Sequence, residues 1–346
     1  HTRNYVRGLL SAGFVKRSMT RDIDWGIPVP LKQEEAKDKV LYVWFDAPIG
    51  YISNTIQWCV EHEQPEANYA QWWKNEDCDI VHFIGEDNTI FHCVIWIAML
   101  KAEGSYRLPR SVVVNQFLNM QFPGQEEEKI SKSKGNAIWL WKYLEEGGSV
   151  DALRYYLTTI APERARSAYN PQDLMQKNNA DLANTLGNFV NRIVSFTHKY
   201  VGAELPQIVD EAVRDIDRDF KADLQKCVDS TTEHLEGYSF KQALEGIMSF
   251  ARACNRYVDA KEPWVTRKDD MDTTKVTLRY ALDAIYSLGV LLLPFIPQSA
   301  EKMLAIFAVD VNSITWSDSL KPLTSDIVLQ KPEILFQKIE IPEQDS

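Results

Sequence analysis

Cysteine is scarce in this sequence, and its spacing offers no scaffold for a metal or a disulfide framework. Five cysteines occur among 346 residues, widely separated and without any C-x-x-C pair. This pattern argues against a disulfide-stabilised fold and against a zinc knuckle, and it favours a reducing compartment. We therefore predict no metal site within the chain and a cytoplasmic location.

Long hydrophobic runs and an excess of basic residues are missing as well. The longest apolar stretch, around 288–296, is interrupted by Pro294 and is too short to span a membrane. The first residues carry no signal-peptide core, and we expect no membrane partner. A formal net charge of −11 argues against broad, nonspecific binding of nucleic acid, which depends on a basic surface. It leaves open the recognition of a few unstacked bases by stacking and hydrogen bonds.

The first part of the chain has the pattern of a parallel sheet. Three nearly continuous apolar stretches, 40–45, 79–84 and 111–114, predict strands buried on both faces. Residues 90–102 have the length and apolar positions of a helix and lie between the last two stretches. Strand, helix and strand in this order predict a βαβ unit.

The pattern becomes helical after Pro162. Apolar positions with helical spacing predict long helices at 182–196, 217–235, 240–254 and 278–292. Short connections between such helices favour an antiparallel bundle. The predicted fold class is therefore α/β followed by all-α.

A cationic loop, Lys129-Ile130-Ser131-Lys132-Ser133-Lys134-Gly135, lies between the two regions. Lysine places a compact charge on a long flexible stem, which suits it to phosphate oxygens that move during a reaction. A solvated lysine loop is the plain alternative.

Two stretches follow predicted strands, at the place where ligands of open parallel sheets bind. The first is 44–51, and the second is Gly85-Glu86-Asp87-Asn88. Asp87 could accept hydrogen bonds from a ribose, and Gly85 would let a ligand approach the backbone. A simple turn is the alternative for the second stretch.

Aromatic residues near these stretches predict a pocket with one imidazole. His92 and Trp96 are one helical turn apart and so share a face. With Trp44 and Tyr51 they could enclose a flexible thioether side chain, because sulfur packs well against aromatic rings. The alternative is that both tryptophans and His92 belong to the core.

Several segments resemble the methionyl-tRNA synthetase family of class I aminoacyl-tRNA synthetases in order and spacing. They are Y-V-W-F-D-A-P-I-G-Y, H-F-I-G-E-D-N, F-H-C-V-I-W-I-A-M-L, K-I-S-K-S, N-A-D-L-A-N-T-L-G-N-F-V-N-R and N-R-Y-V-D-A-K-E-P-W. Together they cover most of the chain. The resemblance implies the second half of a Rossmann-like parallel sheet, a KMSKS-type connecting segment and a helical-bundle anticodon-binding domain.

The resemblance also implies roles for single residues, carried over position by position. The methionine pocket would contain Trp44, Pro48, Tyr51, His92 and Trp96; the ATP site would contain Gly85, Asp87 and Lys132; the catalytic loop would contain Lys129, Ser131, Lys132 and Ser133; and the anticodon readers would be Asn188, Arg192 and Trp264. The implied substrates and partners are methionine, ATP with Mg²⁺, and tRNA(Met).

The resemblance divides the chain into four parts. Residues 1–25 would end an inserted connective domain, 26–118 would complete the catalytic domain, 119–170 would connect, and 171–346 would bind the anticodon. Two departures stand out: Glu86 replaces a usual lysine, and no H-x-G-H sequence occurs. The family carries that motif ahead of an insertion that often holds zinc. We therefore expect the chain to be the C-terminal part of the enzyme, inactive alone in methionine activation but able to bind an anticodon.

Two other readings remain open. A noncatalytic tRNA-binding or scaffold protein could retain the synthetase fold, although it would need neither the pocket aromatics nor the K-I-S-K-S loop. A synthetase for valine, isoleucine or leucine is disfavoured by the aromatic set and by the lack of an editing insertion within the chain.

Overall fold

The structure is a computed structural model that describes residues 2–14, 16–131 and 135–340, and the chain forms two compact units. Unit 1 comprises His1–Phe117 and Pro162–Ala165, and unit 2 comprises Leu118–Ala161 and Arg166–Ser346. The lysine loop and the helical region therefore belong to one compact unit. The finer four-part division stays a prediction.

Unit 1 mixes short helices with strands. Its elements are α1 (Thr2–Ala12), β1 (Thr20–Arg21), β2 (Val40–Leu41), α2 (Val43–Asp46), α3 (Gly50–Glu61), α4 (Ala70–Trp73), β3 (Val81–Gly85), α5 (Trp96–Glu103) and β4 (Ser111–Asn115).

The predicted βαβ unit is confirmed. Strands β3 and β4 pair in parallel, with Val81 opposite Ser111 and Gly85 opposite Asn115. The helix between them begins with a π-helical turn, Phe91–Ile95, and continues as α5. Its buried face joins a small core of Ile52, Trp73, Trp96 and Leu100.

The predicted strand over 40–45 is wrong beyond its first two residues. Only Val40–Leu41 is a strand, paired antiparallel with β1 rather than joined to the parallel sheet, and Val43–Asp46 is the short helix α2. Tyr42 still donates its backbone N–H to Met19, but β1 begins only at Thr20. A run of β-branched and aromatic residues needs a neighbouring strand to remain extended. Here Val43 is exposed rather than buried on both faces.

Unit 2 contains a small sheet and most of the helices. Its elements are β5 (Leu118–Met120), β6 (Glu128–Lys129), α6 (Leu140–Glu145), α7 (Val150–Thr159), β7 (Ser167–Tyr169), α8 (Pro171–Lys177), α9 (Asn188–Tyr200), α10 (Asp215–Glu236), α11 (Phe240–Lys261), α12 (Pro263–Thr266), α13 (Met271–Leu292) and α14 (Pro297–Ala305). A π-helical segment, Asn178–Gly187, joins α8 to α9 without a break.

Strand β5 lies in the middle of the three-stranded sheet of unit 2. It pairs antiparallel with β6 and parallel with β7. Because β6 ends at Lys129, this sheet fixes the first residue of the lysine loop.

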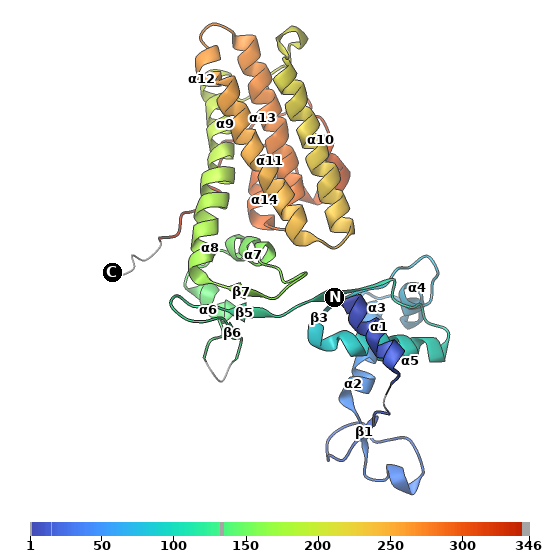
Figure 1. Ribbon diagram of the computed structural model, residues 1–346. Coiled ribbons are helices and arrows are strands. Elements are labelled where there is room, and N and C mark those ends of the chain that lie inside the picture. Colours follow the sequence, from blue (N-terminus) through green and yellow to red (C-terminus); the bar gives the residue numbers. More distant parts are fainter. Residues whose placement is uncertain (1, 15, 132–134, 341–346) are drawn as a thin grey trace. The chain divides into compact units, whose positions relative to one another are not determined.

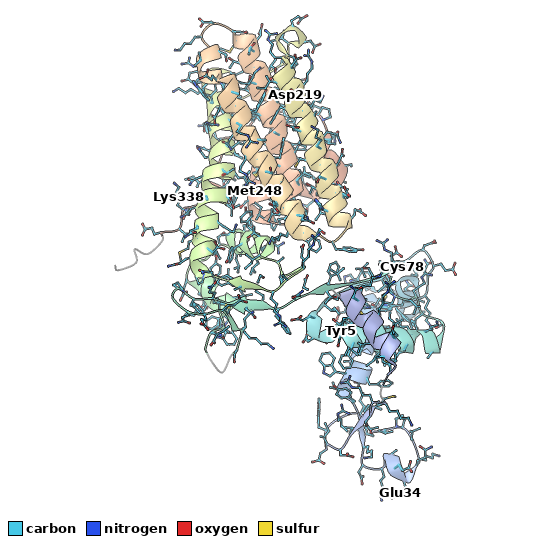
Figure 2. The ribbon with its side chains drawn as sticks, in the orientation of Figure 1. Tyr5, Glu34, Cys78, Asp219, Met248 and Lys338 are labelled. Carbon is cyan, nitrogen blue, oxygen red and sulfur yellow. The ribbon has the colours of Figure 1, made fainter. Side chains whose placement is uncertain are left out.

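The four long helices predicted from apolar spacing are present and share one core. Helices α9, α10, α11 and α13 lie side by side (Figure 1). Helix α13 is the most deeply packed, with Leu278, Leu282 and Ile285 fully buried. Met248 on α11 belongs to the same core and is labelled in Figure 2.

Polar contacts from α7 hold the start of α14 and the short segment between α13 and α14. Asp151 on α7 accepts a hydrogen bond at 2.6 Å from the backbone N–H of Ser299 at the start of α14. Arg154, one turn further along α7, donates to the backbone carbonyl of Phe295 at 2.9 Å. Among the described residues, none of the helices is both long and apolar enough to cross a membrane.

Candidate functional site

The turn after β3 has the geometry expected of a ligand-binding strand end. Gly85 closes β3, and a Cβ atom at this position would lie 2.8 Å from Oδ1 of Asp87. The glycine therefore lets the Asp87 carboxylate fold back over the strand end. Asp87 itself is exposed, so its oxygens are open to a ligand.

A cavity of about 450 Å³ lies at the same edge of the parallel sheet. Its lining includes Glu86 and Thr89 after β3, and Val114 and Gln116 at the end of β4. Gln116 donates its side-chain N–H to the backbone carbonyl of Arg164 at 2.8 Å, which holds the segment Pro162–Ala165 beside this edge. The volume is within the range of small-molecule sites. Gly85 and Asp87 are neighbours of the cavity and do not line it.

Tyr51 and His92 form a direct hydrogen-bonded pair. The Tyr51 hydroxyl lies 2.8 Å from Nε2 of His92, and Nδ1 of His92 lies 3.1 Å from the backbone oxygen of Asn88. A carbonyl can only accept, so Nδ1 carries a proton and, in the neutral ring, Nε2 accepts from Tyr51. His92 is buried while Tyr51 remains 39% exposed, so one ring faces solvent and the other orients it.

His82 is a member of this cluster that the sequence analysis missed. Its Nε2 accepts a hydrogen bond from the Trp96 indole at 3.2 Å, and its ring centroid is 5.4 Å from that of His92. Burial, and then the nearby His92, lower the pKa of His82 to about 4. The apolar run 79–84 that surrounds His82 was the available signal, but a lone histidine in a predicted strand is usually a core residue.

Trp96, Trp44 and Pro48 occupy three different environments. Trp96 is 1% exposed, its ring centroid lies 6.2 Å from that of Trp73, and its hydrogen bond to His82 connects it to the Tyr51–His92 pair. Trp44 on α2 is 40% exposed and stacks on Phe91 at 5.2 Å. Pro48 is buried in the turn between α2 and α3. The structure thus brings Tyr51 and His92 together and leaves Trp44 half-exposed next to the same helix.

The lysine loop is closed at its base by Asn136, which the sequence analysis also missed. The backbone N–H of Ser131 donates to Oδ1 of Asn136 at 2.7 Å, and Nδ2 of Asn136 donates to the carbonyl of Lys129 at 3.1 Å. Lys129 is exposed at the end of β6. Lys132 and Ser133 lie outside the described residues.

The three predicted anticodon readers lie on one surface of unit 2. Asn188 and Arg192 are one turn apart on α9, and the Arg192 guanidinium carbon lies 5.8 Å from the centroid of the Trp264 ring. Trp264, in α12, is 37% exposed, and Asn188 is exposed. Arg192 is also held by Asp259 at 3.0 Å. The arrangement presents an aromatic ring, a guanidinium and an amide together.

The described ranges contain no group of three or more histidine, cysteine, aspartate or glutamate side chains placed to hold a metal ion. All five cysteines are free thiols. Burial raises the pKa of the Cys227 thiol to about 11 and also raises that of the Cys93 thiol. Neither thiol therefore has the lowered pKa of a nucleophile.

Comparison with known proteins places both units in one family. The family described as tRNA synthetases class I (M) matches residues 1–194, and the anticodon binding domain of methionyl tRNA ligase matches residues 209–346. A methionine–tRNA ligase of Porphyromonas gingivalis is 42% identical over 338 residues, which are 96% of this chain and 47% of that protein. One from Thermococcus kodakarensis is 40% identical over 88% of this chain and 41% of its own length. The chain thus spans about half the length of these relatives.

Solved structures agree with this assignment. The Mycobacterium tuberculosis methionyl-tRNA synthetase bound by methionyl-adenylate has a TM-score of 0.82 and 28% identity, and the match covers 97% of this chain and 63% of that one. Its ligand-free form gives a TM-score of 0.80. The nucleotide-binding and helical anticodon-domain folds are therefore both present, and this chain belongs to the methionyl-tRNA synthetase family of class I aminoacyl-tRNA synthetases.

Proposed function

We propose that this chain works as part of a methionyl-tRNA synthetase, which activates methionine with ATP and transfers it to tRNA(Met) in the cytoplasm. Unit 1 contributes part of the methionine and adenosine sites. Unit 2 contributes the KMSKS-type phosphate loop and an antiparallel helical bundle that binds the anticodon. The observation that carries the proposal furthest is the exposed Trp264 ring beside the Arg192 guanidinium.

The surface around Trp264 has the chemistry that recognition of single-stranded RNA requires. Unstacked bases bind to aromatic rings and guanidinium planes, and amides read their hydrogen-bonding edges. Asp259 and Asn255 hold Arg192 in place, at 3.0 and 3.4 Å from its guanidinium nitrogens. A fixed guanidinium loses less entropy on binding than a mobile one. We assign stacking to Trp264 and the preference for the CAU anticodon to Asn188 and Arg192.

Unit 1 supplies a wall suited to the methionine side chain. The half-exposed rings of Trp44 and Tyr51 can contact a thioether, and the hydrogen bond from Tyr51 to His92 fixes one of them. Trp44→Ala and His92→Ala in the complete enzyme should reduce the preference for methionine over leucine. A hydrophobic pocket discriminates by about 1–3 kcal/mol per methylene-sized difference, and unchanged ratios in both variants would assign these residues to the core.

The nucleotide would lie at the carboxyl ends of β3 and β4, with Gly85 and Asp87 at its ribose. Glu86 places a carboxylate at the nearby cavity, whose lining also includes Arg164, and the phosphates of ATP need further cations to balance their charge. We assign that role to Mg²⁺ bound with the substrate and to Lys129 and Lys132, and we place Ser131 and Ser133 with them in the phosphate loop.

The role of the lysine loop is tested by comparing two quantities, the rate of methionine activation and the affinity for methionine. Lys132→Ala in the complete enzyme should lower the activation rate and leave methionine affinity nearly unchanged, because its charge stabilises phosphates mainly in the transition state. The purified chain by itself should show no methionine-dependent ATP–pyrophosphate exchange, since it contains no H-x-G-H sequence. Exchange at the rate of a complete synthetase would contradict this assignment.

Anticodon binding is the activity to test first. The purified chain is titrated with an RNA stem-loop that carries CAU and with the same stem carrying a scrambled loop. Trp264→Ala should weaken CAU binding by roughly ten- to a hundredfold, because stacking contributes about 1–3 kcal/mol per base. Asn188→Ala and Arg192→Gln should reduce the difference in affinity between the CAU loop and the scrambled loop.

Trp25→Ala is the matched control. Trp25 is 86% exposed and belongs to unit 1, so its truncation removes an accessible indole and leaves every residue of α9 and α12 unchanged. It should leave the affinity unchanged. Equal affinity of the wild-type chain for both loops, or no loss in Trp264→Ala, would refute the assigned anticodon surface.

A further inference from the structure

A second aromatic and cationic pair lies further along α9 from the Trp264 surface. The Arg267 guanidinium carbon is 4.2 Å from the centroid of the Tyr200 ring, and Nζ of Lys199 is 5.1 Å from the same centroid. Tyr200 is also in ring contact with Phe196 at 4.6 Å, which supports the phenol from within α9. Tyr200 and Arg267 are both partly exposed. Neither residue has a role in the anticodon surface described above.

The two pairs follow each other along the same two segments. Arg192 and Tyr200 are eight residues apart on α9, which corresponds to about 12 Å along the axis. Trp264 and Arg267 are three residues apart, in α12 and at its end. Helix α9 therefore provides the cation of the first pair, Arg192, and the ring of the second, Tyr200. The segment from 264 to 267 provides the ring of the first pair and the cation of the second. One stacked base cannot span both pairs, so the second pair is a separate position.

Arg192 and Arg267 differ in whether a carboxylate neutralises the guanidinium. Arg192 pairs with Asp259 at 3.0 Å. The Arg267 guanidinium makes no ion pair or hydrogen bond with any residue in the described ranges, and its buried Nε atom has no partner. Lys199 and Arg267 together lower the pKa of the Tyr200 hydroxyl, mainly through the Lys199 hydrogen bond. Two cations, Lys199 and Arg267, thus lie beside one ring, and such a pair suits an anionic ligand.

We propose that Tyr200, Arg267 and Lys199 form a second nucleotide position, which binds an unpaired nucleotide of the same RNA loop outside the anticodon triplet. The base stacks on the layered guanidinium and phenol, and a neighbouring phosphate is bound by the free donors of Arg267 and by the Lys199 ammonium. This inference rests on the proposed anticodon binding at Trp264. It adds a site that fixes the register of the loop rather than reading the triplet.

The test uses the whole chain and the CAU stem-loop. Tyr200→Leu should weaken binding roughly tenfold by removing the stacking ring, whereas Tyr200→Phe should retain wild-type affinity. Arg267→Gln should weaken binding and lower the slope of log K against log salt by about one, because one phosphate contact is lost. Lys302→Gln is the charge-matched control, since Lys302 lies on α14, where its ammonium faces Glu333 at 3.6 Å; it should change neither quantity.

A fluorescent base analogue, 2-aminopurine, placed next to the triplet identifies the nucleotide. Its fluorescence should be quenched when the RNA is bound by the wild-type chain, and also by Trp264→Ala at a protein concentration that saturates the RNA. Binding to Tyr200→Leu should leave the fluorescence unquenched. A large loss in Trp264→Ala with wild-type behaviour of Tyr200→Leu and Arg267→Gln would overturn the second position and leave the anticodon surface intact. Wild-type behaviour of all three variants would overturn both. Thermal unfolding of each variant verifies that it is folded.

Discussion

A buried ion pair at the base of the Trp264 segment offers the sharpest test of how unit 2 is held together. Lys261 ends α11 and lies three residues before Trp264, and its ammonium is 2.9 Å from Oδ2 of Asp217 near the start of α10. The two side chains are 6% and 0% exposed. Lys261→Met keeps most of the apolar stem of the side chain and removes the ammonium, with its charge and its hydrogen bond to Asp217. The variant therefore tests the polar part of the contact with little change in apolar packing.

The expected loss follows from what Asp217 retains. Its carboxylate still accepts from the Tyr257 hydroxyl at 2.6 Å and from the backbone N–H of Arg214 at 2.8 Å, but it has lost its cation. Removing one member of a buried ion pair costs about 3–5 kcal/mol, because the other charge stays buried without compensation. For a unit of this size that corresponds to a fall in melting temperature of roughly 6–20 °C.

Urea denaturation followed by circular dichroism measures the change, with an unaltered m-value as the sign that the folded and unfolded states have kept their compactness. The double variant Asp217→Asn/Lys261→Met is the control that decides the reasoning. It removes the unpaired charge, so it should be more stable than Lys261→Met although it carries one more substitution. A double variant whose loss equals or exceeds the sum of the two single losses would refute an electrostatic cause and assign the effect to packing.

Three further predictions concern unit 1 and the lysine loop. The pKa of His82 is lowered from 6.5 to about 4 in the folded chain, so between these pH values the unfolded chain binds a proton that the folded chain does not. The free energy of unfolding should therefore fall as the pH falls from about 6.5 to about 4. In His82→Gln the melting temperature should depend less on pH over that window. Gly85→Ala should displace the exposed Asp87 carboxylate, 2.8 Å from the new Cβ, so calorimetry should show weaker adenosine binding with a melting temperature nearly unchanged; equal losses in both would contradict a binding role. Asn136→Ala removes both hydrogen bonds at the base of the loop and should speed hydrogen exchange at the Ser131 amide several-fold, while Asn136→Asp, which keeps the acceptor, should lie between.

The sequence by itself determined the four long helices of unit 2 and the parallel pair of strands of unit 1. The limits of α9, α11 and α13 differ from the predicted ones by up to seven residues, and only α10 lies within two residues of its prediction. The presence of the four helices was still determined, because apolar residues every three or four positions define a buried face whatever packs against it. The same holds for β3 and β4, because two apolar runs separated by a helix have few other ways to pair. The order and spacing of the family segments determined the family.

Only the tertiary structure decided which of those residues meet. Strand formation in 40–45 depended on a partner, and β1 supplied one for two residues only. His82 joined the Tyr51–His92 cluster because β3 turns it toward the helix that carries Trp96, and no local pattern distinguishes such a histidine from a core one. The pairing of Tyr200 with Arg267 joins residues 67 positions apart in sequence, across the fold of α9 against α12. Spacing along the chain encodes which face a residue occupies, whereas the contact between two faces is a property of the packed chain.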